Sequence, residues 1–163
     1  MFFDKYPNEV WFVYGLVFLY SVSYQLQSPI EIFLVEKLSK GEDLATTYGN
    51  LKTLFAAVVM ISSLIFGKIL DQYGLRAGFI LVFLACASTF GIMSIADSME
   101  MLYLSKIPAI FHSGYLAAQC CIIKLSKPGE ERLVALGRLA SSYTLGGIIG
   151  PALGGWLGSE GDY

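Results

Sequence analysis

The sequence predicts an all-α membrane protein, a polytopic bundle of transmembrane helices. Of its 163 residues, 55% are hydrophobic and only 15% are charged, and the mean hydropathy is +0.61. A soluble domain of this length could not bury that much apolar surface in one core. Apolar stretches also recur at about the 20 residues that a helix needs to cross the hydrocarbon of a bilayer. We therefore expect the lipid bilayer to be the surroundings in which the chain folds.

Five apolar stretches are predicted to span the membrane, at residues 10–34, 48–70, 75–96, 101–123 and 133–158. The first is not expected to be a cleavable signal. Asp4, Lys5 and Glu9 precede it in place of a basic patch, and no small-residue cleavage site follows it. We expect this helix to stay in the membrane with the other four.

The distribution of lysine and arginine predicts the orientation of the bundle, because cytoplasmic loops are enriched in both. With a cytoplasmic N-terminus, the inner loops hold Lys5, Lys68, Arg76, Lys124, Lys127, Arg132 and Arg138. The outer loops then hold Lys37 and Lys40. This excess predicts that the N-terminus lies in the cytoplasm and that residues 159–163 lie outside.

Polar side chains within the predicted spans indicate a cavity or pathway, and the candidates are Tyr24, Gln25, Lys106, His112 and Gln119. A lysine at the middle of a membrane helix costs roughly 2.5–3.5 kcal/mol on insertion scales, so it should face a partner or water. Lys106 is therefore predicted to line the pathway. A structural ion pair and a side chain that snorkels to the interface remain alternatives, and one hydrogen bond within the bundle would also explain His112.

Helical spacing groups these side chains further. Ser21, Gln25 and Ser28 share one face of the first span, and Tyr20, Tyr24, Gln27 and Glu31 share the adjoining face. On the fourth span, Lys106 is expected to lie with Ser113, about 120° from His112. Lys52, near the outer end of the second span, is expected to snorkel.

Two glycine patterns stand out. Residues 67–78, GKILDQYGLRAG, form a short charged hairpin between two spans, in which Gly67 would allow close helix approach and Gly74 a tight turn. Asp71 could hold a helix N-terminus or an arginine as a latch. On the fifth span Gly146, Gly150 and Gly154 recur every fourth residue and form a smooth stripe for close helix packing. Pro151 is expected to bend that helix.

The two patterns resemble signatures of the major facilitator superfamily. The hairpin is similar to the family's loop 2-3 signature through Gly67, Asp71, Gly74 and Arg76, although Leu75 stands where an arginine is usual. The stripe is similar to its fifth-helix antiporter signature, and the matching residues are Gly146, Gly150, Pro151, Gly154 and Gly155. In the family, the second signature is typical of proton-coupled exporters.

A finer resemblance covers most of the chain. Residues 47–78 and 104–138 are similar to the organic-cation-transporter-like branch of the solute carrier 22 group and to bacterial drug/proton antiporters. The resemblance implies secondary active transport of small organic cations or drug-like solutes in exchange for protons. Lys106 stands where related transporters carry an arginine associated with proton coupling. A lysine keeps the charge there but loses the guanidinium fork.

The length of the chain conflicts with a complete transporter. Facilitator folds comprise two six-helix halves that rock around a central site, whereas five spans are predicted here. We expect the chain to be the N-terminal portion of a transporter whose C-terminal half is its missing partner. A splice form and a small protein that assembles with another chain are alternatives. In the last case, the chain would be a non-transporting membrane scaffold that uses the glycine stripe as an interface.

Other functions are not favoured by the sequence. Cys86, Cys120, Cys121 and the single histidine suggest neither a disulfide framework nor a metal site, and no cofactor is expected. No phosphate-binding GxxxxGK[ST] loop is present. The net charge of −2 and the lack of a basic soluble face argue against nucleic acid as a partner. We predict no enzymatic activity, because no nucleophile and base pattern lies within the spans.

Overall fold

Helices joined by short turns make up the whole described part of the chain. The computed structural model describes residues 8–39 and 43–160, and Lys5, Lys40 and the last predicted outer residues, 161–163, lie outside this part. The elements in order are α1 (Asn8–Leu38), α2 (Leu44–Ser94), α3 (Met99–Leu104), the 3-10 segment η1 (Ile107–Phe111), α4 (Gly114–Leu125) and α5 (Glu130–Glu160). No strand occurs among these residues, so the all-α prediction is confirmed.

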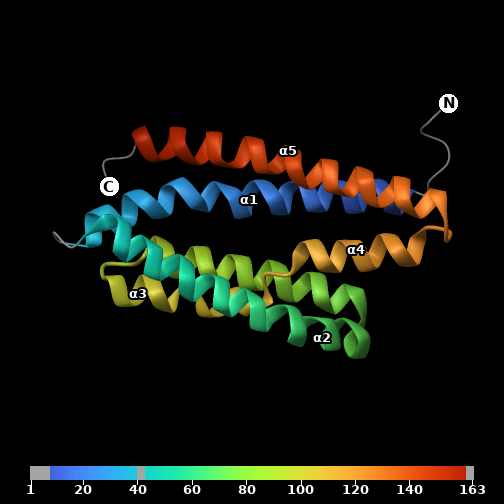
Figure 1. The fold of residues 1–163 in the computed structure, drawn as a ribbon, viewed down its shortest axis with the longest axis horizontal. Coiled ribbons are helices and arrows are strands. Elements are labelled where there is room, and N and C mark those ends of the chain that lie inside the picture. The colour runs from blue at the N-terminus through green and yellow to red at the C-terminus, as the bar shows by residue number, and fades with distance from the viewer. Residues whose placement is uncertain (1–7, 40–42, 161–163) are drawn as a thin grey trace.

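The element α2 contains both the second and the third predicted span. It runs to Gly74, where the backbone leaves the helical region with φ 81° and ψ 171°, and then returns along the bundle (Figure 1). A positive φ of this size is open to glycine and strained for residues with a Cβ atom. The tight turn expected at Gly74 is therefore present in the backbone geometry.

The fourth predicted span is broken rather than continuous. In place of one helix over residues 101–123, the chain forms α3, η1 and α4, with the breaks at Ser105–Lys106 and at His112–Ser113. Pro108 lies within η1, lacks a backbone N–H and disfavours helical geometry in the residue before it. The expected shared face of Lys106 and Ser113 is therefore wrong, because no single helix connects them.

Large apolar side chains cover much of the outer surface. Phe12, Met60 and Leu64 are each at least two-thirds exposed. By length and composition, two described helices could cross a membrane, namely α2 and residues Glu130–Gly158 of α5. The count of five spans remains a prediction.

The closest packing in the bundle joins the first and last helices. In Figure 1, α1 and α5 lie side by side and run in the same direction. A Cβ atom added to Gly146 would lie 2.8 Å from the carbonyl oxygen of Phe18, and one added to Gly150 would lie 2.7 Å from that of Val22. Ser21 strengthens this seam by donating a hydrogen bond of 2.6 Å to the carbonyl of Tyr143. The predicted close approach therefore occurs within the chain, against α1.

The stripe of Gly146, Gly150 and Gly154 continues to Gly158, whereas Gly155 of the matching signature lies outside it. Gly154 and Gly158 also face α1, against Leu26, Pro29 and Phe33. A Cβ atom added to Gly155, in contrast, would meet nothing within 4 Å, so this glycine does not belong to the packed face. Because α1 already covers the stripe, these glycines do not offer a free interface to a second chain, on which the scaffold alternative depends.

We predict that Gly150→Ala lowers the free energy of unfolding by about 1–3 kcal/mol, because the new methyl group has no room beside the α1 backbone. The matched control is Gly155→Ala, which adds the same methyl group to open space. It should leave stability unchanged or raise it by up to about 1 kcal/mol through helix propensity. Unfolding by SDS titration in mixed micelles measures both. Equal effects of the two substitutions would contradict the seam.

Candidate functional site

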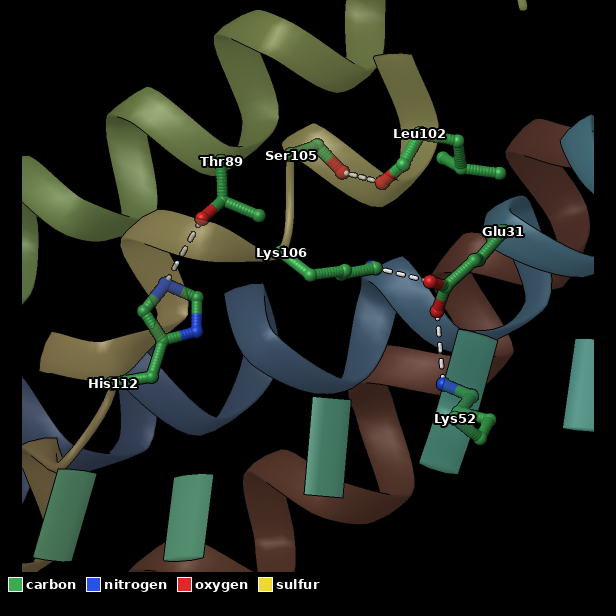
Figure 2. Close-up of polar contacts among 7 residues, drawn as sticks. All are labelled: Glu31, Lys52, Thr89, Leu102, Ser105, Lys106 and His112. Atoms are coloured by element: carbon green, nitrogen blue, oxygen red, sulfur yellow. Dashed lines mark hydrogen bonds and ion pairs between the residues drawn. The ribbon is translucent and has the colours of Figure 1, made fainter. Parts of the chain in front are cut away.

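The main polar feature of the bundle is a carboxylate held between two lysines. Glu31 of α1 forms ion pairs with Lys106 through Oε1 and with Lys52 of α2 through Oε2, the second at 2.8 Å. Figure 2 shows both ammonium groups directed at the same carboxylate from separate parts of the chain. The side chains of Glu31 and Lys106 are each 1% exposed, whereas that of Lys52 is 38% exposed. We call these three residues the charged triad.

The break in the fourth span positions the buried lysine of this triad. Lys106 precedes η1, between the end of α3 and Pro108, where the chain is not held in a continuous α-helix. Ser105 is fixed beside it through a hydrogen bond of 2.6 Å to the carbonyl of Leu102. Irregular backbone at membrane depth is tolerated where it is buried in protein or lines a cavity. The local structure therefore directs a long cationic side chain inward at this point.

A small polar cavity adjoins the triad. Its volume is about 70 Å³, and besides the triad it is lined by Tyr24, Gln25, Gln27, Ser28 and Phe55. The cavity is partly open to the surface and has room for a few water molecules. The two predicted faces of the first span thus meet at one cavity, and Tyr24, Gln25 and Lys106 of the predicted pathway all line it.

Aromatic rings surround the cations of the triad. The Lys52 ammonium lies 5.1 Å from the ring centre of Tyr48, and the Lys106 ammonium lies 5.6 Å from that of Phe55. Tyr24 lies next to Phe55, with 6.2 Å between ring centres. The face of an aromatic ring attracts cations within about 6 Å of its centre. The site therefore combines one carboxylate with several rings that favour positive charge.

His112 and Gln119 lie away from this cavity. The His112 ring is 3.4 Å from the hydroxyl of Thr89 through Nε2 (Figure 2) and stands edge-on to Tyr24, with 6.1 Å between ring centres. Its carbonyl accepts a hydrogen bond of 2.9 Å from Tyr20. Gln119 is half-buried on α4 and is not among the side chains that line the cavity. His112 thus borders the site through its contact with Tyr24, and Gln119 is not among the residues that line it.

The loop 2-3 residues lie outside the triad. Asp71 and Arg76 are exposed on either side of Gly74, and Asp71 has no ion pair or hydrogen bond among the described residues. A Cβ atom on Gly67 would meet nothing within 4 Å, so the close helix approach expected there does not occur within the described residues. Arg76 borders an apolar groove with Phe12 and Phe79.

Lys52 and Glu31 have a larger part in the charged triad than the sequence pattern indicates. Lys52 is predicted to snorkel, but its ammonium is directed at Glu31 and not only at solvent. Helical spacing places Glu31 on a polar face without assigning it a role. The available signal is charge, because a carboxylate in an apolar span needs a cationic partner as much as a lysine does.

Apolar helices that enclose a paired charge cluster define a polytopic membrane protein with an internal polar site. The chain belongs to the Major Facilitator Superfamily, whose family model matches residues 12–163. It is therefore an integral membrane protein of a transporter family.

Three relatives illustrate the range of the similarity. The human solute carrier family 67 member A1 is 36% identical over 81% of the chain and 31% of the relative. The mouse solute carrier family 22 member 18 is 34% identical over 69% of the chain and 29% of the relative. The class H tetracycline resistance protein of Pasteurella multocida is 30% identical over 80% of the chain and 32% of the relative. The chain thus spans about a third of the length of these relatives. No solved structure gives a significant match.

We predict that Lys106→Met lowers the free energy of unfolding by about 3–5 kcal/mol, because it removes the buried partner of a carboxylate that is 1% exposed. The double variant Glu31→Gln/Lys106→Met should recover most of this loss, since neither charge is then left alone. Lys52→Met is the matched control and should cost no more than about 1 kcal/mol, because its ammonium is partly solvated. Additive losses in the double variant, measured by SDS titration, would argue against the pair.

Proposed function

We propose that the chain forms part of a secondary active transporter that exchanges protons for small organic cations or drug-like solutes. The observation that carries this proposal is the charged triad beside a polar, aromatic-walled cavity. Two relatives are named as solute carriers and a third as a tetracycline resistance protein, which supports small organic molecules as the solute class. Because the chain spans about a third of the length of these relatives, the activity of a whole transporter is itself part of this proposal.

Glu31 is the proton-binding group in this proposal. Its carboxylate charge attracts both ammonium groups, and a proton on either oxygen removes that charge and weakens both ion pairs. The same charge would bind an organic cation, so a proton and the solute would compete for one carboxylate. Competition of this kind couples the two flows in opposite directions. Lys106 keeps the empty carboxylate compensated inside the bundle.

The other predicted residues receive supporting roles. Tyr24 and Gln25 line the pathway, and His112 contacts it through Tyr24. Asp71 and Arg76, exposed at the Gly74 turn, would hold one access state by contacting another part of the transporter. The α1–α5 seam seals this half of the bundle. We further propose that the N-terminus is cytoplasmic, in line with the distribution of basic residues.

Proton exchange predicts a clear effect on uptake. In proteoliposomes containing the full-length protein, a pH gradient should drive uptake of labelled tetraethylammonium, and Glu31→Gln and Lys106→Ala should each reduce it to background. Lys106→Arg keeps the positive charge and should retain part of the activity. Gln119→Ala, outside the cavity, is the control for expression and folding. Unchanged pH-driven uptake in Glu31→Gln would reject the coupling role.

The pathway itself can be tested by cysteine labelling. In a full-length variant without native cysteines, a membrane-impermeant thiol reagent should label Tyr24→Cys from the aqueous phase, because Tyr24 lines the polar cavity. Leu19, five residues earlier on the same helix, is 59% exposed on the apolar surface, so Leu19→Cys should stay unlabelled. Protection of Tyr24→Cys in every access state would contradict a pathway along this face of α1.

A further inference from the structure

We propose that Lys52 competes with the solute for Glu31. The Lys52 ammonium, which is tethered to the protein, occupies the place on the Glu31 carboxylate that an organic cation takes during binding. This inference rests on the proposed function and assigns a cationic solute group to one oxygen of one carboxylate. Glu31 Oε2 is the oxygen concerned, and Lys52 Nζ now lies 2.8 Å from it.

The two lysines of the triad are not equivalent. The side chain of Lys106 is 1% exposed, so its ion pair with Oε1 is the fixed one. Lys52 is 38% exposed, and rotation of its flexible side chain can carry the ammonium into solvent at low cost. The ion pair of Oε2 is therefore the exchangeable one.

The packing of the helices points to the same asymmetry. α1, which carries Glu31, packs along its length against α5 and only sparsely against α2, which carries Lys52. The Lys52 side chain, which reaches Glu31 from α2, thus contacts the rest of the site mainly through the ion pair itself and the ring of Tyr48. Among the described residues, the contacts of the Lys52 ammonium are thus with Glu31 and with Tyr48, which also forms a side-chain hydrogen bond with it.

The surroundings of the Lys52 ammonium already fit an organic cation. One carboxylate oxygen and the face of the Tyr48 ring contact it, and Phe55 and Tyr24 line the adjoining cavity. A carboxylate with aromatic rings is the arrangement that binds quaternary ammonium groups. Lys52 itself lines this cavity and fills the space next to Glu31 Oε2. Departure of Lys52 therefore both frees the carboxylate and enlarges the cavity.

A competitor on the protein lowers the apparent affinity for the solute by the fraction of time that the site is open. If Lys52 occupies Oε2 for nine-tenths of the time, its removal should tighten binding about tenfold. Together with Lys106, the competitor also keeps the Glu31 carboxylate compensated between cycles.

The test is equilibrium binding of tetraethylammonium to the full-length protein in nanodiscs, with no pH gradient. Lys52→Met and Lys52→Gln should each lower the Kd about tenfold, while Lys52→Arg should leave it near the original value. Lys37→Met removes the same charge from an exposed site at the outer end of α1, away from Glu31, and should change little. Glu31→Gln in the Lys52→Met background should abolish the gain.

Two results would overturn the inference. One is an unchanged or higher Kd in both Lys52→Met and Lys52→Gln. The other is that the anionic probe benzoate binds in place of tetraethylammonium and loses affinity in Lys52→Met, as expected if the lysines attract anions. Because this assay needs no transport, it can succeed when pH-driven uptake fails, so the two proposals are tested separately.

Discussion

A charge within an apolar bundle must be compensated by a partner, and this constraint organises the polar interior of the chain. Glu31 lies on a helix whose neighbours are largely hydrocarbon side chains, and its burial is nearly complete. The fourth predicted span is not a continuous helix around Pro108, and Lys106 at that break compensates the carboxylate. Lys52 supplies the second cation from another helix. Three separate parts of the chain are thus linked through one side chain.

The α1–α5 seam holds two helices together in lipid, where the hydrophobic effect does not drive helix association. Lipid tails are as apolar as leucine side chains, so membrane helices associate through close packing and hydrogen bonds. Gly146 and Gly150 bring the α5 backbone against the carbonyl groups of α1. The hydroxyl of Ser21 adds a direct bond to the carbonyl of Tyr143. The helix that carries Glu31 is therefore held along one side, whereas its contact with α2 stays slight.

Much of this organisation can be predicted from the sequence, and the remainder shows where such reasoning stops. Composition and the length of the apolar stretches predict an all-helical membrane protein, and the four-residue spacing of glycines predicts a packed stripe. That α1 is the covering helix could not be predicted, because Ser21 and Tyr143 are 122 residues apart and only the folded bundle brings them together. Lys106 is expected to need a partner, yet identifying Glu31 requires the same tertiary information. Pro108 is the sequence signal of the broken helix. The long apolar stretch in which it lies favours one continuous span instead, so the break is not predicted.

The order in which the triad is synthesised follows from its spacing in the chain. Glu31 precedes both lysines, and Lys52 follows it by 21 residues. At roughly 5–20 residues per second of translation, Lys52 is available within about 1–4 seconds, long before the break that carries Lys106 has been made. During insertion, Lys52 is thus the first of these two cations that can accompany the carboxylate into the bilayer. The side chain that pairs reversibly with Glu31 in the finished bundle therefore also stands where it can neutralise that carboxylate while the bundle is being made.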